Sequence, residues 1–409
     1  MSRAHHSLAP LAGAASLAFV LLASPAAGAE DALEGLLPED PLAGGKLFVQ
    51  RGCVRCHAVY GEGGALGPDL GKTKINRGFL ELAGVMWNHS PRMQEEFGRL
   101  HFARPVFTED EMAKIIAFVY FLNYFDSPGD PVRGEALFAE KSCRRCHSVG
   151  GAGGAAGGPL DEFGKYASPV FISTAMWNSG SRMTEAMRRE GVPRPIFEQS
   201  DIRDILAFVR RDAHRGDDEN RVFLPPGNPR NGGRLFREKR CVECHAIRGA
   251  RWSAGPDLGR AELHGSLSAI AGFQWNHGPA MWEMMERKGL PVPRFTPREM
   301  SDIVTYLYFV QYVEEPGDES AGRALFVEKG CRSCHAVDEG TSSEGPAVAG
   351  MEPFHSPAAV IAAMWNHASE MERLTWEKNI VWPTVMGREM ADLVAFLLSA
   401  SKQPAAETR

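Results

Sequence analysis

The chain has 409 residues, 44% of them hydrophobic and 23% charged, with a formal net charge of −6. Its length allows two to four domains, and its composition is that of an ordinary globular protein. So mild a charge gives no reason to expect a nucleic-acid partner.

The first 29 residues differ from the rest of the chain. Arg3 precedes an apolar stretch from Leu17 to Leu22, and Ala27-Gly28-Ala29 supplies the small residues of a cleavage site. This pattern predicts a secretory signal peptide over residues 1–29, with the mature chain periplasmic or otherwise exported. An uncleaved anchor is the alternative, which the short apolar core disfavours. No later segment of the sequence is long and apolar enough to cross a bilayer.

The sequence reads Cys-x-x-Cys-His four times, and these motifs use all eight cysteines. The pattern is the attachment motif of c-type haem, in which two thiols add to the haem and the next imidazole reaches the iron. In an exported protein this chemistry also protects the thiols from oxidation. We therefore expect four covalently bound haem c groups. The predicted attachment residues are Cys53, Cys56, Cys143, Cys146, Cys241, Cys244, Cys331 and Cys334. The predicted proximal iron ligands are His57, His147, His245 and His335.

The four motifs are the fixed points of an internal repeat. Their histidines are 90, 98 and 90 residues apart. In each unit a glycine and a phenylalanine precede the motif, a Gly-Pro pair follows it, and a Trp-Asn pair comes later. Each unit ends in an apolar stretch of helical periodicity. Because little of the sequence alternates with period two, we predict an all-α fold of four tandem units.

Two details of the repeat predict how each unit closes. Thr108 with Glu111, and Thr296 with Glu299, are capping boxes at the start of the last helix in units 1 and 3. An aromatic residue stands 61 positions after every motif histidine, and we expect it to pack on the phenylalanine that precedes the motif. The expected pairs are Phe48 with Phe118, Phe138 with Phe208, Phe236 with Tyr306, and Phe326 with Phe396.

The connections between units differ in length. The predicted units are 30–127, 128–211, 232–315 and 316–409, with a linker over 212–231. Units 1 and 2, and units 3 and 4, are joined by similar short Pro-Gly-Asp segments, whereas the linker is longer and polar. We therefore predict two tight halves, in which unit 1 packs on unit 2 and unit 3 packs on unit 4.

These motifs resemble class I cytochrome c: Gly-x-x-x-Phe, Cys-x-x-Cys-His, Gly-Pro-Asp-Leu, a methionine and a final helix with an aromatic residue. The resemblance covers nearly all of the mature chain and implies one small helical domain around each haem. It also implies a proline whose carbonyl holds the proximal imidazole and leaves Nε2 free for iron. That role falls on Pro68, Pro159, Pro256 and Pro346.

Two residue types compete to be the sixth iron ligand. Methionine occurs 36 residues after every motif histidine, whereas histidine at offset 32 occurs in three units and is Ser179 in unit 2. The methionine alone can serve all four irons, and a thioether suits low-spin iron. The proposed distal ligands are Met93, Met183, Met281 and Met371. The alternative is ligation by two histidines in units 1, 3 and 4, through His89, His277 and His367. Methionine predicts a higher reduction potential than histidine.

The Trp-Asn pairs allow two interpretations. Each indole could donate its N–H to a haem propionate or simply cover the haem face, and each asparagine could brace the methionine segment. The pairs begin at Trp87, Trp177, Trp275 and Trp365.

Three functions are compatible with four haems. Every unit offers a sixth ligand at the same place, which favours an electron carrier over a catalyst with an open coordination position. An oxidoreductase acting on peroxide, nitrite or a sulfur compound is the alternative. A haem subunit of a membrane respiratory complex is the third. We expect redox proteins as donor and acceptor, and the sequence identifies neither.

Overall fold

The computed structural model describes most of the chain downstream of the predicted signal peptide, which lies outside the described residues. The described residues are 37–73, 78–165, 168–198, 200–213, 224–249, 254–261, 266–337, 344–349 and 354–402. Helices dominate them, as predicted, and the strands are only two or three residues long. No helix among the described residues is long and apolar enough to span a membrane.

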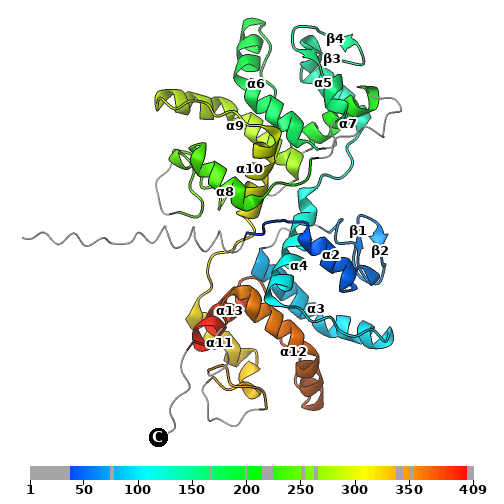
Figure 1. The fold of residues 1–409 in the computed structure, drawn as a ribbon, viewed down its shortest axis with the longest axis vertical. Coiled ribbons are helices and arrows are strands. Elements are labelled where there is room, and N and C mark those ends of the chain that lie inside the picture. Colours follow the sequence, from blue (N-terminus) through cyan, green and yellow to red (C-terminus); the bar gives the residue numbers. More distant parts are fainter. Residues whose placement is uncertain are drawn as a thin grey trace, which may run out of the picture.

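Each unit is built from a short first helix, a 3-10 turn at the motif, a long helix and a last helix (Figure 1). Unit 1 has α2 (Ala43–Gln50), η1 (Cys53–Arg55), α3 (Phe79–Arg99), α4 (Glu109–Phe121) and η2 (Leu122–Tyr124). Unit 2 has α5 (Pro131–Glu140), η3 (Cys143–Arg145), η4 (Asp161–Lys165), α6 (Val170–Arg189) and α7 (Asp201–Ala213). Unit 3 has α8 (Pro229–Glu238), η6 (Cys241–Glu243), α9 (Leu267–Arg287) and α10 (Pro297–Phe309). Unit 4 has α11 (Glu319–Glu328), η7 (Cys331–Ser333), α12 (Pro357–Glu377) and α13 (Glu389–Ala400).

The strands form two small sheets beside the motifs of units 1 and 2. In unit 1, β1 (Ala58–Val59) pairs antiparallel with β2 (Glu62–Gly63). In unit 2, β3 (His147–Val149) pairs antiparallel with β4 (Ala152–Gly153) and parallel with β5 (Gly158–Pro159).

The first and last helices of every unit cross, as predicted. The four aromatic pairs lie with ring centroids 5.3–5.7 Å apart. The crossing is tight because a glycine of the first helix meets the backbone of the last. A Cβ at Gly322 would lie 1.9 Å from the carbonyl oxygen of Asp392, for example. Both predicted capping boxes are also present, at Thr108 and Thr296.

The units are paired differently from our prediction. Unit 1 packs on unit 4 through α3, α12 and α13, and unit 2 packs on unit 3 through α6 and α9. Figure 1 shows the two resulting lobes, with units 2 and 3 above and units 1 and 4 below. The prediction that unit 1 packs on unit 2 and unit 3 on unit 4 is therefore wrong. The short connections join unit 1 to unit 2 and unit 3 to unit 4 along the chain. The long helix of unit 1 nevertheless buries its apolar face against unit 4, and that of unit 2 buries its face against unit 3.

The Trp-Asn pairs make the contact within each lobe. Each indole Nε1 donates to a proline carbonyl of the opposite unit at 2.7–2.9 Å, so it is not available to a haem propionate. Each asparagine donates to a carbonyl of the opposite unit and accepts from the N–H of the same residue. We call each of these four contacts a clasp. The clasp residues and their backbone partners are Trp87-Asn88 with Pro383 and Val385, Trp365-Asn366 with Pro105 and Phe107, Trp177-Asn178 with Pro293 and Phe295, and Trp275-Asn276 with Pro195 and Phe197.

The two lobes meet through units 1 and 3. The hydroxyls of Tyr120 and Tyr308 each donate to the other residue's carbonyl at 2.9 Å, in a fully buried aromatic cluster. Carboxylates from the two short connections add reciprocal contacts, because Glu314 accepts N–H bonds from the start of α3 and Asp126 accepts from the start of α9. Burial raises the pKa of both carboxyl groups. This reciprocity relates the first half of the chain to the second by an approximate two-fold axis.

Candidate haem sites

The motif histidines are held in the same way in all four units. Nδ1 of each imidazole lies 3.1 Å from a backbone carbonyl oxygen eleven residues further on. In units 1, 3 and 4 the carbonyl belongs to the predicted proline: Pro68, Pro256 and Pro346. This bond places the proton on Nδ1 and leaves Nε2 as an acceptor, the state in which imidazole binds iron.

Unit 2 departs from the predicted pattern. The carbonyl beside His147 belongs to Gly158, so the prediction for Pro159 is wrong. Pro159 stands twelve residues after the histidine rather than eleven, and Gly158 takes the position with a φ of +77°. The chain between motif and Gly-Pro is longer here by one residue, and glycine accommodates the change at little steric cost.

In each unit, the glycine ten residues after the motif histidine packs directly against the imidazole ring. A Cβ at Gly67 would lie 2.3 Å from Cε1 of His57, and the equivalent glycines of the other units leave equally little room. The N–H of each glycine also donates to the carbonyl of the second motif cysteine, at 2.6–2.8 Å. The orientation of the imidazole ring is therefore fixed by two contacts, with this glycine and with the carbonyl that accepts from Nδ1. The equivalent glycines are Gly157, Gly255 and Gly345.

The cysteines of each motif lie on one 3-10 turn. The residue before each turn has a left-handed backbone, and the second cysteine's N–H bonds to the first cysteine's carbonyl. Burial raises the pKa of the first cysteine of each motif, Cys53 and its three counterparts, to about 11. Two thiols beside an imidazole that has Nε2 free match the donor set of haem c attachment.

The long helices of units 1, 3 and 4 carry both distal candidates on one stripe, whereas α6 of unit 2 carries the methionine and has Ser179 at the histidine position. In α9, Phe273, His277 and Met281 follow one another at intervals of four residues. Nδ1 of His89, His277 and His367 bonds to the carbonyl four residues earlier, at 2.7–2.9 Å, so Nε2 of each is free to bind metal. Met93, Met183 and Met281 pack at the edges of the hydrophobic cores.

In unit 3 the end of α9 lies beside the motif, because Lys288 donates to the carbonyl of Glu243 at 3.3 Å. Burial lowers the pKa of His245, and the charge of His277 lowers it further. The residues present therefore fit a haem: attachment thiols and a tethered imidazole on one side, and soft or imidazole donors on the other. No cluster of His, Cys, Asp and Glu able to hold a bare metal ion occurs among the described residues.

A model of the family described as cytochrome c matches the chain three times, over residues 42–122, 131–211 and 229–310. The matches cover more than half of the chain. The chain belongs to the cytochrome c family. Its domains are of the class I type, they bind haem c covalently, and their function is electron transfer. Unit 4 lies outside the matched ranges, but α11, α13 and the His335 contact reproduce the arrangement of the other units. No curated protein and no solved structure matches the chain.

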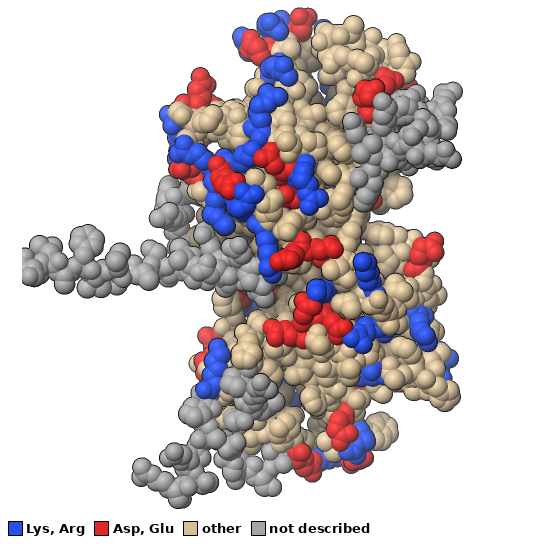
Figure 2. Space-filling view, in the orientation of Figure 1, with Lys and Arg blue, Asp and Glu red and all other residues tan. Residues whose placement is uncertain are grey.

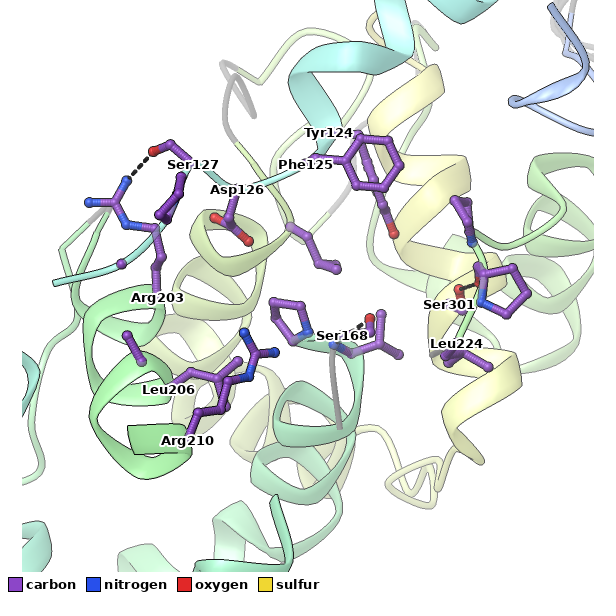
Figure 3. A pocket seen from close by; sticks show the side chains of 18 residues that line it. Tyr124, Phe125, Asp126, Ser127, Ser168, Arg203, Leu206, Arg210, Leu224 and Ser301 are labelled. Carbon is purple, nitrogen blue, oxygen red and sulfur yellow. Dashed lines mark hydrogen bonds between the residues drawn. The ribbon is translucent and has the colours of Figure 1, made fainter. Parts of the chain in front are cut away.

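A cavity of about 240 Å³ lies apart from the haem motifs, where the connection between units 1 and 2 passes units 2 and 3 (Figure 3). Its described lining includes Asp126, Ser127 and Arg203, and none of its lining residues is a motif cysteine or histidine. Arg203 donates to Ser127 at 2.8 Å across the mouth of the cavity. We do not assign this cavity to the haem chemistry.

Sequence reasoning missed two residues that bear on the sites. Arg104 and Arg194 occupy equivalent positions before the clasp prolines, and each guanidinium lies over a clasp tryptophan of the opposite unit. Their spacing from the motif, 47 residues in both cases, is visible in the sequence. Its meaning depends on the pairing of units 1 with 4 and 2 with 3.

Proposed function

We propose that this cytochrome is an exported tetrahaem electron carrier, with four covalently attached haems ligated by histidine and methionine. The observation that carries the proposal is a four-fold recurrence: two thiols on a turn and an imidazole tethered through Nδ1 in the structure, with a methionine 36 residues after each motif histidine in the sequence. Haem c supplies one-electron chemistry at an iron that keeps both axial ligands. The expected axial methionines are Met93, Met183, Met281 and Met371.

The protein's own residues perform three tasks in this proposal. The motif cysteines fix each haem in place through thioether bonds. The carbonyl beside Nδ1 holds the imidazole so that Nε2 keeps its direction in both oxidation states. The packed helices exclude water and limit rearrangement when an electron arrives, which is what a carrier requires. None of these tasks needs an open coordination position.

The paired units suggest how the electrons move within the molecule. The helices that carry the distal candidates contact each other within a lobe, α3 with α12 and α6 with α9. Haems of units 1 and 4 would therefore form one close pair, and haems of units 2 and 3 the other. The buried contact between units 1 and 3 joins the pairs. Export follows from the predicted signal peptide, and one-electron redox proteins are the expected partners.

Carbon monoxide distinguishes this carrier from an enzyme with one catalytic haem. The reduced protein should contain four haems per chain by the pyridine haemochrome assay and should bind almost no carbon monoxide, because every iron has two protein ligands. Stoichiometric binding at one haem would contradict the carrier and support the oxidoreductase.

Replacing Met281 by alanine tests the distal ligand. We expect Met281→Ala to remove one quarter of the weak far-red methionine–iron band, and His277→Ala to leave that band unchanged. His277→Ala is the matched control, because the two side chains lie one turn apart on α9. The reverse result would show ligation by two histidines, His245 and His277, in unit 3.

A further inference from the structure

The residue that follows each proposed distal methionine points into the contact between the paired units. These residues are Gln94, Thr184, Trp282 and Glu372. In both lobes they surround one arginine that also lies over a clasp tryptophan. The arginine therefore contacts the residue next to a proposed distal ligand in each of the two paired units. The two lobes differ in whether the charge of that arginine is balanced.

In the lobe of units 1 and 4, the arginine has a carboxylate partner. Arg104 is 3.6 Å from Glu372, and their side chains are only 7% and 12% exposed. Ser90 bridges them, since it accepts from Arg104 at 2.7 Å and donates to Glu372 at 2.6 Å. The guanidinium lies 3.9 Å from the ring centroid of Trp365. The guanidinium of Arg104 thus has a carboxylate beside it that can balance its charge.

In the lobe of units 2 and 3, an aromatic residue replaces the carboxylate. Arg194 lies 3.6 Å from the ring centroid of Trp275 and 5.4 Å from that of Trp282. It donates to Thr184 at 2.7 Å and to the carbonyl of Trp275 at 2.6 Å. No ion pair of Arg194 occurs among the described residues, and burial lowers its pKa to about 10, so it stays charged at neutral pH.

Two glycines leave room for a tryptophan at the position where the other lobe has a glutamate. Trp282 stands at the position of Glu372, and a Cβ at Gly180 or Gly278 would lie 2.6 or 2.9 Å from its ring. Gly180 stands at the position of Ser90. The tryptophan and the glycine thus occur together where the other lobe has Glu372 and Ser90, and no carboxylate among the described residues pairs with Arg194.

The net charges of the two lobes differ in the same direction, because the lobe of units 2 and 3 is the more positive one. Residues 128–213 and 229–310 contain 24 Lys and Arg against 19 Asp and Glu, whereas the whole chain contains 45 against 51. Figure 2 shows basic side chains gathered over the upper lobe and acidic ones near the waist between the lobes. A positive environment favours the reduced form of a haem, because reduction adds a negative charge.

We infer that the unbalanced Arg194 makes the haems of units 2 and 3 the higher-potential pair, so that electrons pass from the lobe of units 1 and 4 to the lobe of units 2 and 3. This inference rests on the proposed function. In each step one ferrous haem of the first lobe loses an electron and one ferric haem of the second gains it. A one-electron donor protein refills the first lobe, and a one-electron acceptor protein empties the second.

Spectroelectrochemical titration of the holoprotein and its variants tests the inference. Thr184→Glu places a carboxylate beside Arg194 and should lower the two highest of the four potentials. The expected change is about tenfold in the equilibrium constant of each couple, or about 59 mV. Glu372→Gln leaves Arg104 unbalanced and should raise the two lowest potentials. Arg188→Met is the matched control: it changes the charge on α6 by the same amount, but at an exposed side chain, where solvent screens it.

The outcomes separate the inference from the function beneath it. Fewer than four one-electron couples would contradict the tetrahaem carrier itself. If four couples are found, three results would overturn the inference but not the function. Thr184→Glu could shift the two lowest potentials, shift none of them, or shift the same pair as Glu372→Gln. Arg194→Met provides a second variant, and it should shift the same two couples as Thr184→Glu and in the same direction.

Discussion

Replacing both Asn88 and Asn366 by alanine is expected to destabilise the contact between units 1 and 4 by about 4 kcal/mol. Each substitution leaves the N–H and carbonyl of Val385 or Phe107 without their amide partner in a largely buried interface. An unpaired buried polar group costs about 1–3 kcal/mol. The measurement is urea unfolding of the holoprotein followed by circular dichroism, with native proteolysis to locate the loosened segment.

Two further variants serve as controls for this experiment. Asn178→Ala with Asn276→Ala should have a similar effect but should expose the lobe of units 2 and 3, because the same bonds are made there. Ser369→Ala, on the same helix as Asn366, should leave the unfolding midpoint nearly unchanged. An unchanged midpoint in the double variant of units 1 and 4 would show that the clasps do not hold the lobe together.

The fold of a single unit could be predicted because local patterns determine it. The caps at Thr108 and Thr296, the periodic last helices and the aromatic pairs each follow from residues within about ninety positions. The resemblance to class I cytochrome c, through the Gly-Pro pair after each motif, also located the proximal carbonyl in three units. In unit 2 it failed by one residue, since a glycine with positive φ absorbed an insertion that spacing alone could not place.

The pairing of units could not be predicted in the same way. A recurring Trp-Asn pair is compatible with a role inside its own unit or across an interface, and its periodicity is the same in both cases. Its partners are backbone carbonyls and N–H groups, for example those of Phe107, which carry no distinctive side-chain signature. The short connections pointed to the wrong neighbours, because closeness in sequence limits distance but does not decide which apolar faces are buried together.

The roles of Arg104 and Arg194 depend on that pairing. An arginine before a proline looks like a surface residue, and only the partner unit decides whether it meets Glu372 or Trp282. Units of the same fold can thus differ in electrostatics through one position next to the proposed distal methionine. The proposed direction of electron transfer follows from this difference between Glu372 beside Arg104 and Trp282 beside Arg194.

Gly322→Ala is expected to open unit 4 at the crossing of α11 and α13, with a loss of about 3 kcal/mol. The new Cβ would lie 1.9 Å from the carbonyl oxygen of Asp392 and 2.8 Å from Cβ of Phe396. Backbone and a fully buried ring cannot move aside as a flexible side chain would, so the helices must separate. Urea unfolding measures the loss, and the absorbance of the haem attached at Cys331 and Cys334 reports the local change.

Gly98→Ala is the matched control for the helix crossing. It makes the same chemical change near the end of α3, where nothing lies within 4 Å of the new Cβ. Alanine favours helix over glycine, so this variant should be unchanged or more stable by up to about 1 kcal/mol. Equal stability of the two variants would show that the crossing tolerates a wider separation. Loss confined to Gly322→Ala would establish that the glycine before each motif sets how closely a unit closes over its haem.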